Sequence, residues 1–132
     1  MATVKFNQNG GSIYLKVKSG PPCLAGFRLW YRNILIGNVT QLYPNEPNLI
    51  HDHFPDNLVL PFDLSSIKDI TLRIIGRYGP VPNHTQIAVR YLFYQDGQLL
   101  NVEPNGYNII QDNLTSPPPY KQYNHDFNFQ PL

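Results

Sequence analysis

Cysteine is almost absent from the 132-residue chain, which contains only Cys23. A single thiol excludes an intramolecular disulfide, and without a CxxC partner or a neighbouring histidine it does not indicate redox or nucleophilic chemistry. The GxSxG, Walker and GxGxxG motifs are also absent, and the carboxylates show no pairing typical of glycosidases. We therefore expect a protein that is not an enzyme.

Long hydrophobic runs are missing as well. No stretch approaches the roughly 18 consecutive apolar residues that span a bilayer, so we expect no membrane insertion. The sequence does not open on a basic segment followed by an apolar run, which is the pattern of a secretory signal peptide. We expect a cytoplasmic protein on this ground. Secretion by a signal-less route, or a leader trimmed from the sequence, is the alternative.

Charged residues are scarce, at 14% of the chain, and the net charge is only +1. This balance gives no general electrostatic attraction to nucleic acid or to anionic lipid. The chain is instead rich in uncharged polar side chains, with nine Tyr and fourteen Asn. We therefore expect a carbohydrate or a protein as the partner, and no nucleic acid.

Alternation of apolar and polar residues dominates the sequence, and helical periodicity is nearly absent. In residues 12–18, for example, Ile13, Leu15 and Val17 fall on one face of a strand. The pairs Asn9-Gly10 and Asp96-Gly97 are strong hairpin signals, because both accept the positive φ of a type I′ turn. The pattern predicts eight to ten short strands separated by turns.

A chain of this kind is expected to be all-β, with little or no helix. The predicted architecture is a two-sheet antiparallel β-sandwich of jelly-roll or Greek-key type. We expect residues 1–115 to form the sandwich domain and residues 116–132 to be a Pro-rich C-terminal segment. That segment would pack on the sandwich or on a neighbouring chain, and its residues 123–129 would form a final edge strand or an ordered tail.

The arginines follow a pattern in the central predicted strands. In "GFRLWYR" (26–32) the two arginines and the only tryptophan alternate with apolar residues, so they share one face. The same alternation recurs around the other three arginines, and we predict that they line the outer face of one sheet together with Trp30 and a tyrosine. The predicted ligand-binding residues are Arg28, Trp30, Arg32, Arg73, Arg77, Arg90 and Tyr94.

Two interpretations of this face remain open. An ordinary solvated face would stack guanidinium planes on Trp and Tyr rings, and would cover apolar atoms with the arginine stems. A binding platform would instead use the aromatic faces for sugar rings and the Arg and Asn donors for hydroxyl or carboxylate groups. A protein partner would use the same anchors.

The segment "HDHFPD" (51–56) is the candidate metal site. In an extended backbone, His51 and His53 would point the same way about 6–7 Å apart, close enough to share a metal ion. Asp52 or Asp56 would supply a carboxylate. We expect no cofactor, and zinc at this segment, or calcium at residues 52–57 or 124–128, is the alternative.

The leading hypothesis is a non-enzymatic β-sandwich module that binds carbohydrate in the manner of a lectin. The second is a structural or assembly subunit, such as a coat, spike or toxin-associated protein. It would form a homo-oligomer through exposed aromatic residues and would add its C-terminal tail to another chain as a strand. The third is a metal-dependent enzyme built on His51 and His53.

Overall fold

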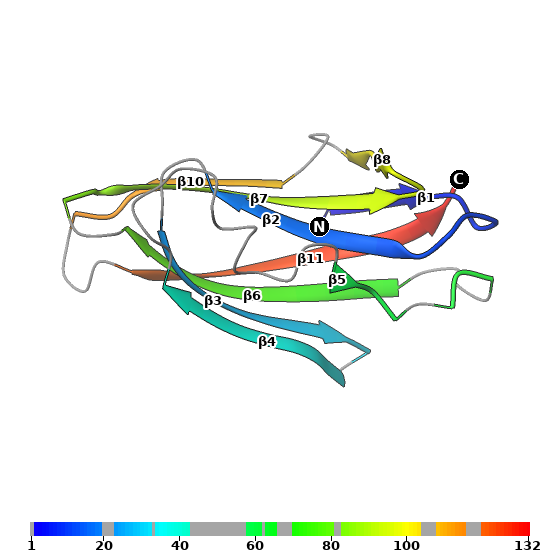
Figure 1. Ribbon diagram of the computed structural model, residues 1–132, viewed down its shortest axis with the longest axis horizontal. Helices are drawn as coiled ribbons and strands as arrows, with labels where there is room; N and C mark the ends of the chain where they lie inside the picture. The colour runs from blue at the N-terminus through cyan, green and yellow to red at the C-terminus, as the bar shows by residue number, and fades with distance from the viewer. Residues whose placement is uncertain are drawn as a thin grey trace.

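The polypeptide forms two β-sheets that lie one above the other (Figure 1). The structure is a computed structural model that describes residues 2–19, 23–32, 34–42, 58–61, 63–65, 70–80, 83–103, 108–115 and 120–132. Within these ranges every regular element is a β-strand, and no helix has the length and apolarity to cross a membrane. The expected all-β class is confirmed.

The larger sheet has six strands and is mixed. All neighbouring strands in it are antiparallel except β1 and β11, which run parallel. Its order is β4 (Ile34–Leu42), β3 (Cys23–Tyr31), β6 (Ile70–Pro80), β11 (Lys121–Pro131), β1 (Ala2–Phe6) and β9 (Val102–Glu103).

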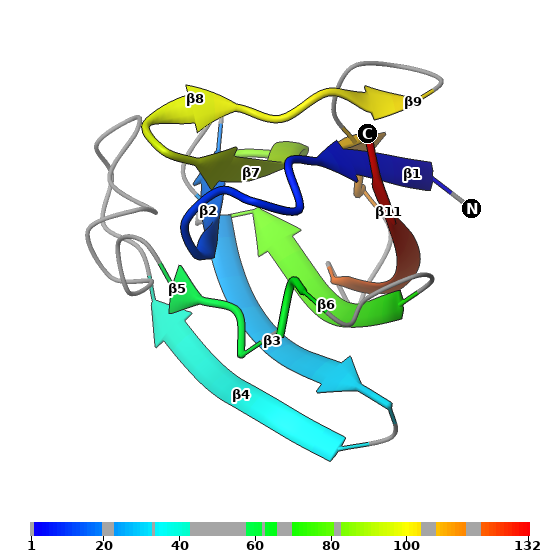
Figure 2. The ribbon, with the colours of Figure 1, turned by 90° about the vertical axis from the view of Figure 1, so that its right-hand side faces the viewer.

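The smaller sheet has five strands, and all its pairs are antiparallel. Its order is β10 (Asn108–Asn113), β7 (Gln86–Gln95), β2 (Ile13–Ser19) and β5 (Leu58–Val59), with β8 (Gln98–Leu99) paired to the end of β7. Figure 2 shows that the larger sheet curves, so that β1 lies level with β7 and β9 lies level with β8.

The core lies between the two sheets. Phe93 of β7 packs edge-on against Phe127 of β11, with ring centroids 4.9 Å apart, so the inner faces are in direct contact. The predicted inner face of β2 is confirmed, because Ile13, Leu15 and Val17 are at most 1% exposed. Burying an aromatic or branched aliphatic side chain stabilises a fold by roughly 1.5–3 kcal/mol, so this interleaved layer is the main source of stability.

The two turns predicted from Asn-Gly and Asp-Gly have different outcomes. Asp96 and Gly97 have φ values of 52° and 75° and connect β7 to β8, as predicted. The hairpin predicted at Asn9-Gly10 is wrong, because β1 and β2 on either side of it belong to different sheets. The connection between them is a crossing from one layer to the other.

The end of β7 explains why the chain crosses at this point. The amide of Gln95, which is only 3% exposed, accepts a hydrogen bond from the Asn7 N–H at 2.9 Å. The same amide donates to the carbonyls of Asn7 and Gly11 at 2.8 and 2.9 Å. Three hydrogen bonds to one buried side chain hold the loop against the smaller sheet. A tight turn still forms within the loop, closed by a hydrogen bond of 3.0 Å from the Gly10 N–H to the Asn7 carbonyl, but β1 and β2 do not pair across it.

The C-terminal strand also differs from expectation. Residues 121–131 form β11, which pairs with β6 on one side and β1 on the other. The prediction of an edge strand or an ordered tail for this segment is therefore wrong. Phe127 and Phe129 are fully buried, but the preceding inner positions are Tyr123 and His125, so the apolar alternation is too weak to reveal a central strand.

Candidate functional site

The outer face of the larger sheet carries the candidate site, because β3 and β6 place alternate residues away from the core. Leu29 of β3 and both Leu72 and Ile74 of β6 are fully buried. The residues that alternate with them along each strand therefore face outward. In the ladder that joins the two strands, Trp30 lies opposite Arg73. The indole and the guanidinium therefore start from neighbouring positions on the same face.

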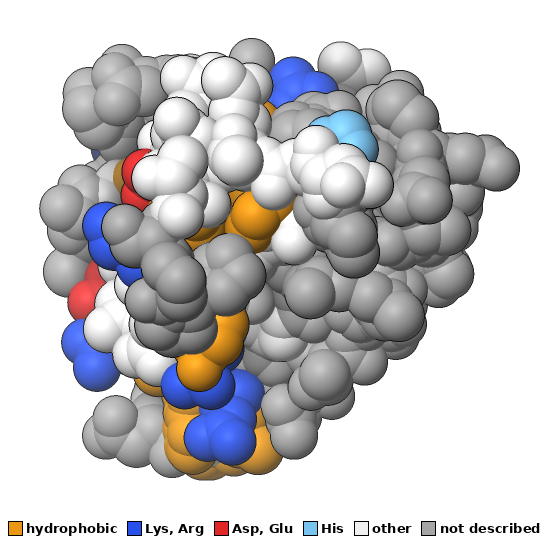
Figure 3. All heavy atoms as spheres, turned by 90° about the vertical axis from the view of Figure 1, so that its left-hand side faces the viewer, with side chains coloured by type: hydrophobic (Ala, Val, Ile, Leu, Met, Phe, Trp, Pro, Cys, Tyr) orange, Lys and Arg blue, Asp and Glu red, His pale blue; other side chains and the backbone are white. Residues whose placement is uncertain are grey.

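An open groove of about 470 Å³ runs over this face, and we call it the arginine groove. It is lined by side chains of β3, β6 and β11 and of the residue that follows β3. They are Arg28, Trp30, Arg32, Thr71, Arg73, Ile75 and Gln122. Arg28, Arg32 and Arg73 are exposed and Trp30 is half-buried, so the indole is accessible. Basic and hydrophobic side chains lie next to each other at the lower rim of Figure 3.

Arg73 is engaged by a carboxylate of β11. Its Nε donates to Oδ1 of Asp126 at 2.8 Å, and Nη2 donates to Oδ2 at 3.0 Å, so the pair is bidentate. The hydrogen bonds from Arg73 hold the pKa of Asp126 below its ordinary value, against the opposing effect of burial. The same contact raises the pKa of Arg73. The pair fixes the orientation of the guanidinium beside Trp30.

We expect Arg73→Gln to raise the pKa of Asp126 toward that of an ordinary aspartate. A carboxylate with a lowered pKa in the folded state stabilises the fold above its unfolded pKa, and this stabilisation is lost as the pH falls through the folded pKa. The variant should therefore lose less stability on acidification than the wild type. The measurement is an NMR titration of the Asp126 carboxyl carbon, with Arg77→Gln as the control. An Asp126 curve that Arg73→Gln leaves unchanged would contradict the pairing.

Arg77 and Arg32 have aromatic rather than carboxylate neighbours. The guanidinium of Arg77 lies 5.3 Å from the centroid of the Tyr120 ring, beyond the groove lining. Arg32 lies 5.3 Å from the centroid of Tyr31. We expected arginines stacked on Trp30, and among the described residues no such contact with Trp30 occurs. Trp30 is half-buried and lines the groove without an arginine stacked on it in the described part of the chain.

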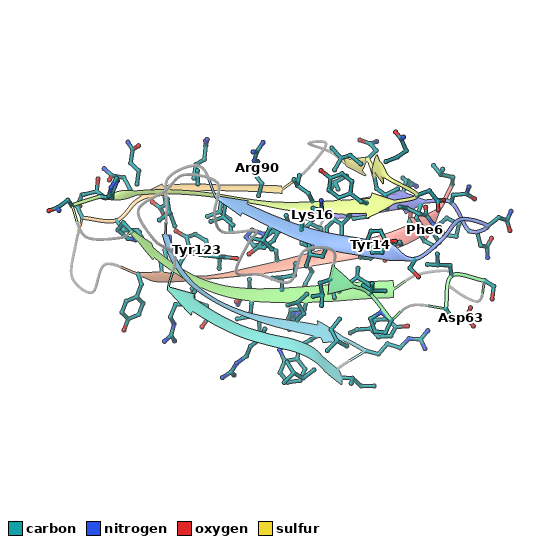
Figure 4. All side chains as sticks on the ribbon, viewed as in Figure 1. Phe6, Tyr14, Lys16, Asp63, Arg90 and Tyr123 are labelled. Carbon is teal, nitrogen blue, oxygen red and sulfur yellow. The ribbon has the colours of Figure 1, made fainter. Side chains whose placement is uncertain are left out.

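Arg90 and Tyr94 do not belong to this face. Both lie on β7 of the smaller sheet, between buried residues, and Figure 4 shows Arg90 on the side of β7 that points away from the larger sheet. Lys16 of β2 lies over the Tyr94 ring, 5.2 Å from its centroid. The prediction of a single arginine face is therefore wrong for these two residues, because β7 pairs with β2 and β10 rather than with β3 or β6.

The predicted metal ligands His51, His53, Asp52 and Asp56 lie outside the described residues. In the part of the chain that is described, no group of three His, Cys, Asp or Glu side chains is arranged to hold a metal ion. Of the second calcium candidate, residues 124–128, Asp126 is bound to Arg73. His125 lies on the inner face, 5.6 Å from the ring of Tyr91, and burial lowers its pKa.

A second cluster of titratable groups joins the two sheets at the inner side of β11. The hydroxyl of Tyr123 donates to Oδ2 of Asp112, on β10, at 2.6 Å. Burial raises the pKa of Tyr123, and this hydrogen bond lowers the pKa of Asp112. Lys121 lies 3.6 Å from the same carboxylate. The cluster fastens β10 to β11, and its groups are not part of the arginine groove.

Three groove residues were not predicted from the sequence as site residues: Thr71, Ile75 and Gln122. The first two share the alternation of Arg73, so the same rule applied to β6 would have found them. Gln122 lies on β11 opposite Arg77, and only the pairing of β11 with β6 brings it to the groove. Comparison of the chain with protein-family models, with curated proteins and with solved structures gives no match.

Proposed function

We propose that the protein is a non-enzymatic binding module that takes a carbohydrate in the arginine groove. The observation that carries the proposal is that the half-buried side chain of Trp30 lines a groove bordered by guanidinium, amide and hydroxyl groups. Indole faces stack on the apolar side of a sugar ring, and the surrounding donors suit its hydroxyl oxygens. A volume of about 470 Å³ falls in the range of about 300–1,000 Å³ usual for small-ligand sites.

The lining supports binding rather than bond cleavage. Glycoside hydrolysis usually requires two carboxylic groups that flank the scissile bond. The carboxylate beside the groove in the described residues, Asp126, is held by two hydrogen bonds from Arg73. In this pair Asp126 is suited to orient the guanidinium of Arg73, and it is poorly suited to act as a general acid or base toward a ligand.

We also infer that the two sheets form a β-sandwich of the jelly-roll or Greek-key group. The path of the chain supports this inference, because it changes sheet repeatedly: β1, β3, β4, β6, β9 and β11 belong to the larger sheet and the others to the smaller one. Such crossings place distant strands side by side, as in β11 between β6 and β1. Folds of this kind present an outer sheet face on which a ligand can lie.

We expect Trp30→Ala to weaken binding at least about tenfold, since truncating a central aromatic anchor costs about 2 kcal/mol or more. A glycan array with and without calcium identifies the ligand, and titration calorimetry on the best probe measures the change. The control is Tyr94→Ala, which removes an aromatic ring from the outer face of the other sheet. A blank array, or equal effects of the two variants, would contradict the proposal.

A second candidate is an assembly subunit of a coat, spike or toxin-associated complex. Its support is the edge strand β4, where Ile34 and Leu35 are 62% and 44% exposed. β11 is already paired on both sides, so the tail does not offer a free strand edge to another chain. Light scattering over a range of concentrations separates the candidates: a constant monomer mass opposes assembly, and a growing mass that Leu35→Asp abolishes favours it.

A further inference from the structure

The arginine groove carries an excess of positive charge. Arg73 forms a neutral pair with Asp126, whose bidentate hydrogen bonds are described above. Arg28 and Arg32 also line the groove, and no carboxylate among the described residues lies within ion-pair distance of either one. In the described part of the chain, the two exposed guanidinium groups that flank Trp30 in the sequence therefore have no carboxylate partner, in a protein whose net charge is only +1.

The backbone of Arg32 has a conformation that is unfavourable for an arginine. It follows β3 in a two-residue connection to β4 and has a φ of 48°, in the left-handed region. Glycine and asparagine adopt this region more readily than a residue with a long side chain. The turn alone therefore favours another residue at position 32. A role for the guanidinium group would account for an arginine at this place, because strained positions are often kept for function.

We infer that the ligand of the groove is an acidic sugar, a saccharide that bears a carboxylate or a sulfate group. The inference rests on the proposed carbohydrate function and names the ligand class of the same site. Arg28 and Arg32 bind the anionic group by charge-assisted hydrogen bonds, which are stronger than those to neutral hydroxyls. Trp30 packs against the ring, and Gln122 and Thr71 contact its hydroxyl groups.

Matched saccharides test the charge of the ligand. The probes are a galacturonic acid hexamer, its methyl ester, a sulfated galactose hexamer and a neutral galactose hexamer, measured by calorimetry at a salt concentration of about 0.15 M. We expect the acid to bind about tenfold or more tightly than its ester, as one charge-assisted hydrogen bond suffices for that factor. The sulfated probe shows whether sulfate replaces carboxylate.

Variants locate the effect in the groove. Arg28→Gln and Arg32→Asn should each weaken binding of the preferred acidic hexamer about tenfold and leave binding of the neutral forms unchanged. Arg90→Gln removes the same charge from the other sheet and should have no effect. Arg32→Asn should also melt at the same temperature as the wild type or a higher one, which separates loss of binding from loss of folding.

The outcomes separate the two proposals. The acidic sugar is overturned, and carbohydrate binding left in place, if the acid binds no more tightly than its ester and the sulfated hexamer no more tightly than the neutral one. Arg28→Gln with unchanged affinity for the preferred acidic probe overturns it as well. Binding of a polyaspartate peptide as tight as that of the hexamer also overturns it, because charge alone would then explain the attraction. If no saccharide binds, charged or neutral, the proposed function fails as well.

Discussion

Replacing Phe127 with alanine is expected to lower the free energy of unfolding by about 3–5 kcal/mol, the usual cost of deleting a fully buried phenylalanine. The ring is completely inaccessible and lies where the two sheets meet. It packs edge-on against Tyr91 and Phe93 of β7, with centroids 5.9 and 4.9 Å away. Because both partners belong to the opposite sheet, the cavity opens at the contact that joins the layers.

Urea denaturation followed by fluorescence and by circular dichroism measures the loss. Tyr120→Ala is the matched control, since this ring is 50% exposed and its removal should cost less than about 1 kcal/mol. A single domain has about 5–15 kcal/mol of stability, so Phe127→Ala should remove a large share of it. A change below about 1 kcal/mol for Phe127→Ala would show that the ring does not hold the sheets together.

The orientation of side chains was predictable because it depends on one strand at a time. A period of two assigns Arg28, Trp30 and Arg73 to one side of their strands whatever lies next to them. The structure puts these three residues in one groove. The same reasoning correctly placed Ile13 and Leu15 in the core.

The assignment of strands to sheets was not predictable in the same way. Arg90 alternates with buried residues just as Arg73 does, yet β7 and β6 belong to different sheets. That choice depends on which strands pair, and the pairs join distant segments, as when Asn128 of β11 meets Thr71 of β6. The bidentate partner of Arg73, Asp126, was out of reach for the same reason, because it lies 53 residues away.

Local turn chemistry predicts a turn, but it does not predict which strands pair on either side of that turn. Asp96-Gly97 turns as its residues predict, and the Asp96 carboxylate also accepts hydrogen bonds from the Gly11 N–H at 3.1 and 3.3 Å. A turn also forms at the equally strong Asn9-Gly10 pair, but the buried amide of Gln95 binds the backbone on both sides of it, at Asn7 and Gly11, and the flanking strands belong to different sheets. A sequence pattern shows the conformational preference of one segment. The position of the flanking strands also depends on hydrogen bonds to distant buried groups, such as the three made by Gln95.

Gly76 of β6 illustrates a constraint that no pattern in the sequence indicates. It is a buried position on the inner face, and the ring of Tyr78, two residues further along the strand, lies back across it. A Cβ atom at position 76 would stand 2.5 Å from Cε2 of Tyr78 and 2.6 Å from its Cζ. The ring has little room to move, because it packs against Tyr123 and its hydroxyl is hydrogen-bonded to the buried hydroxyl of Tyr91.

We therefore expect Gly76→Ala to destabilise the protein by at least about 2–3 kcal/mol, from overpacking and from the strained or lost hydrogen bond of Tyr78. A glycine-to-alanine change elsewhere in a strand is normally neutral or favourable, so the sign of the effect is diagnostic. In a Tyr78→Leu background, which lacks the Cε2, Cζ and hydroxyl atoms, the same change should cost little. Denaturation of the four proteins of this double-mutant cycle measures the coupling. An alanine that costs the same with and without the ring would place the conflict in the backbone of β6 instead.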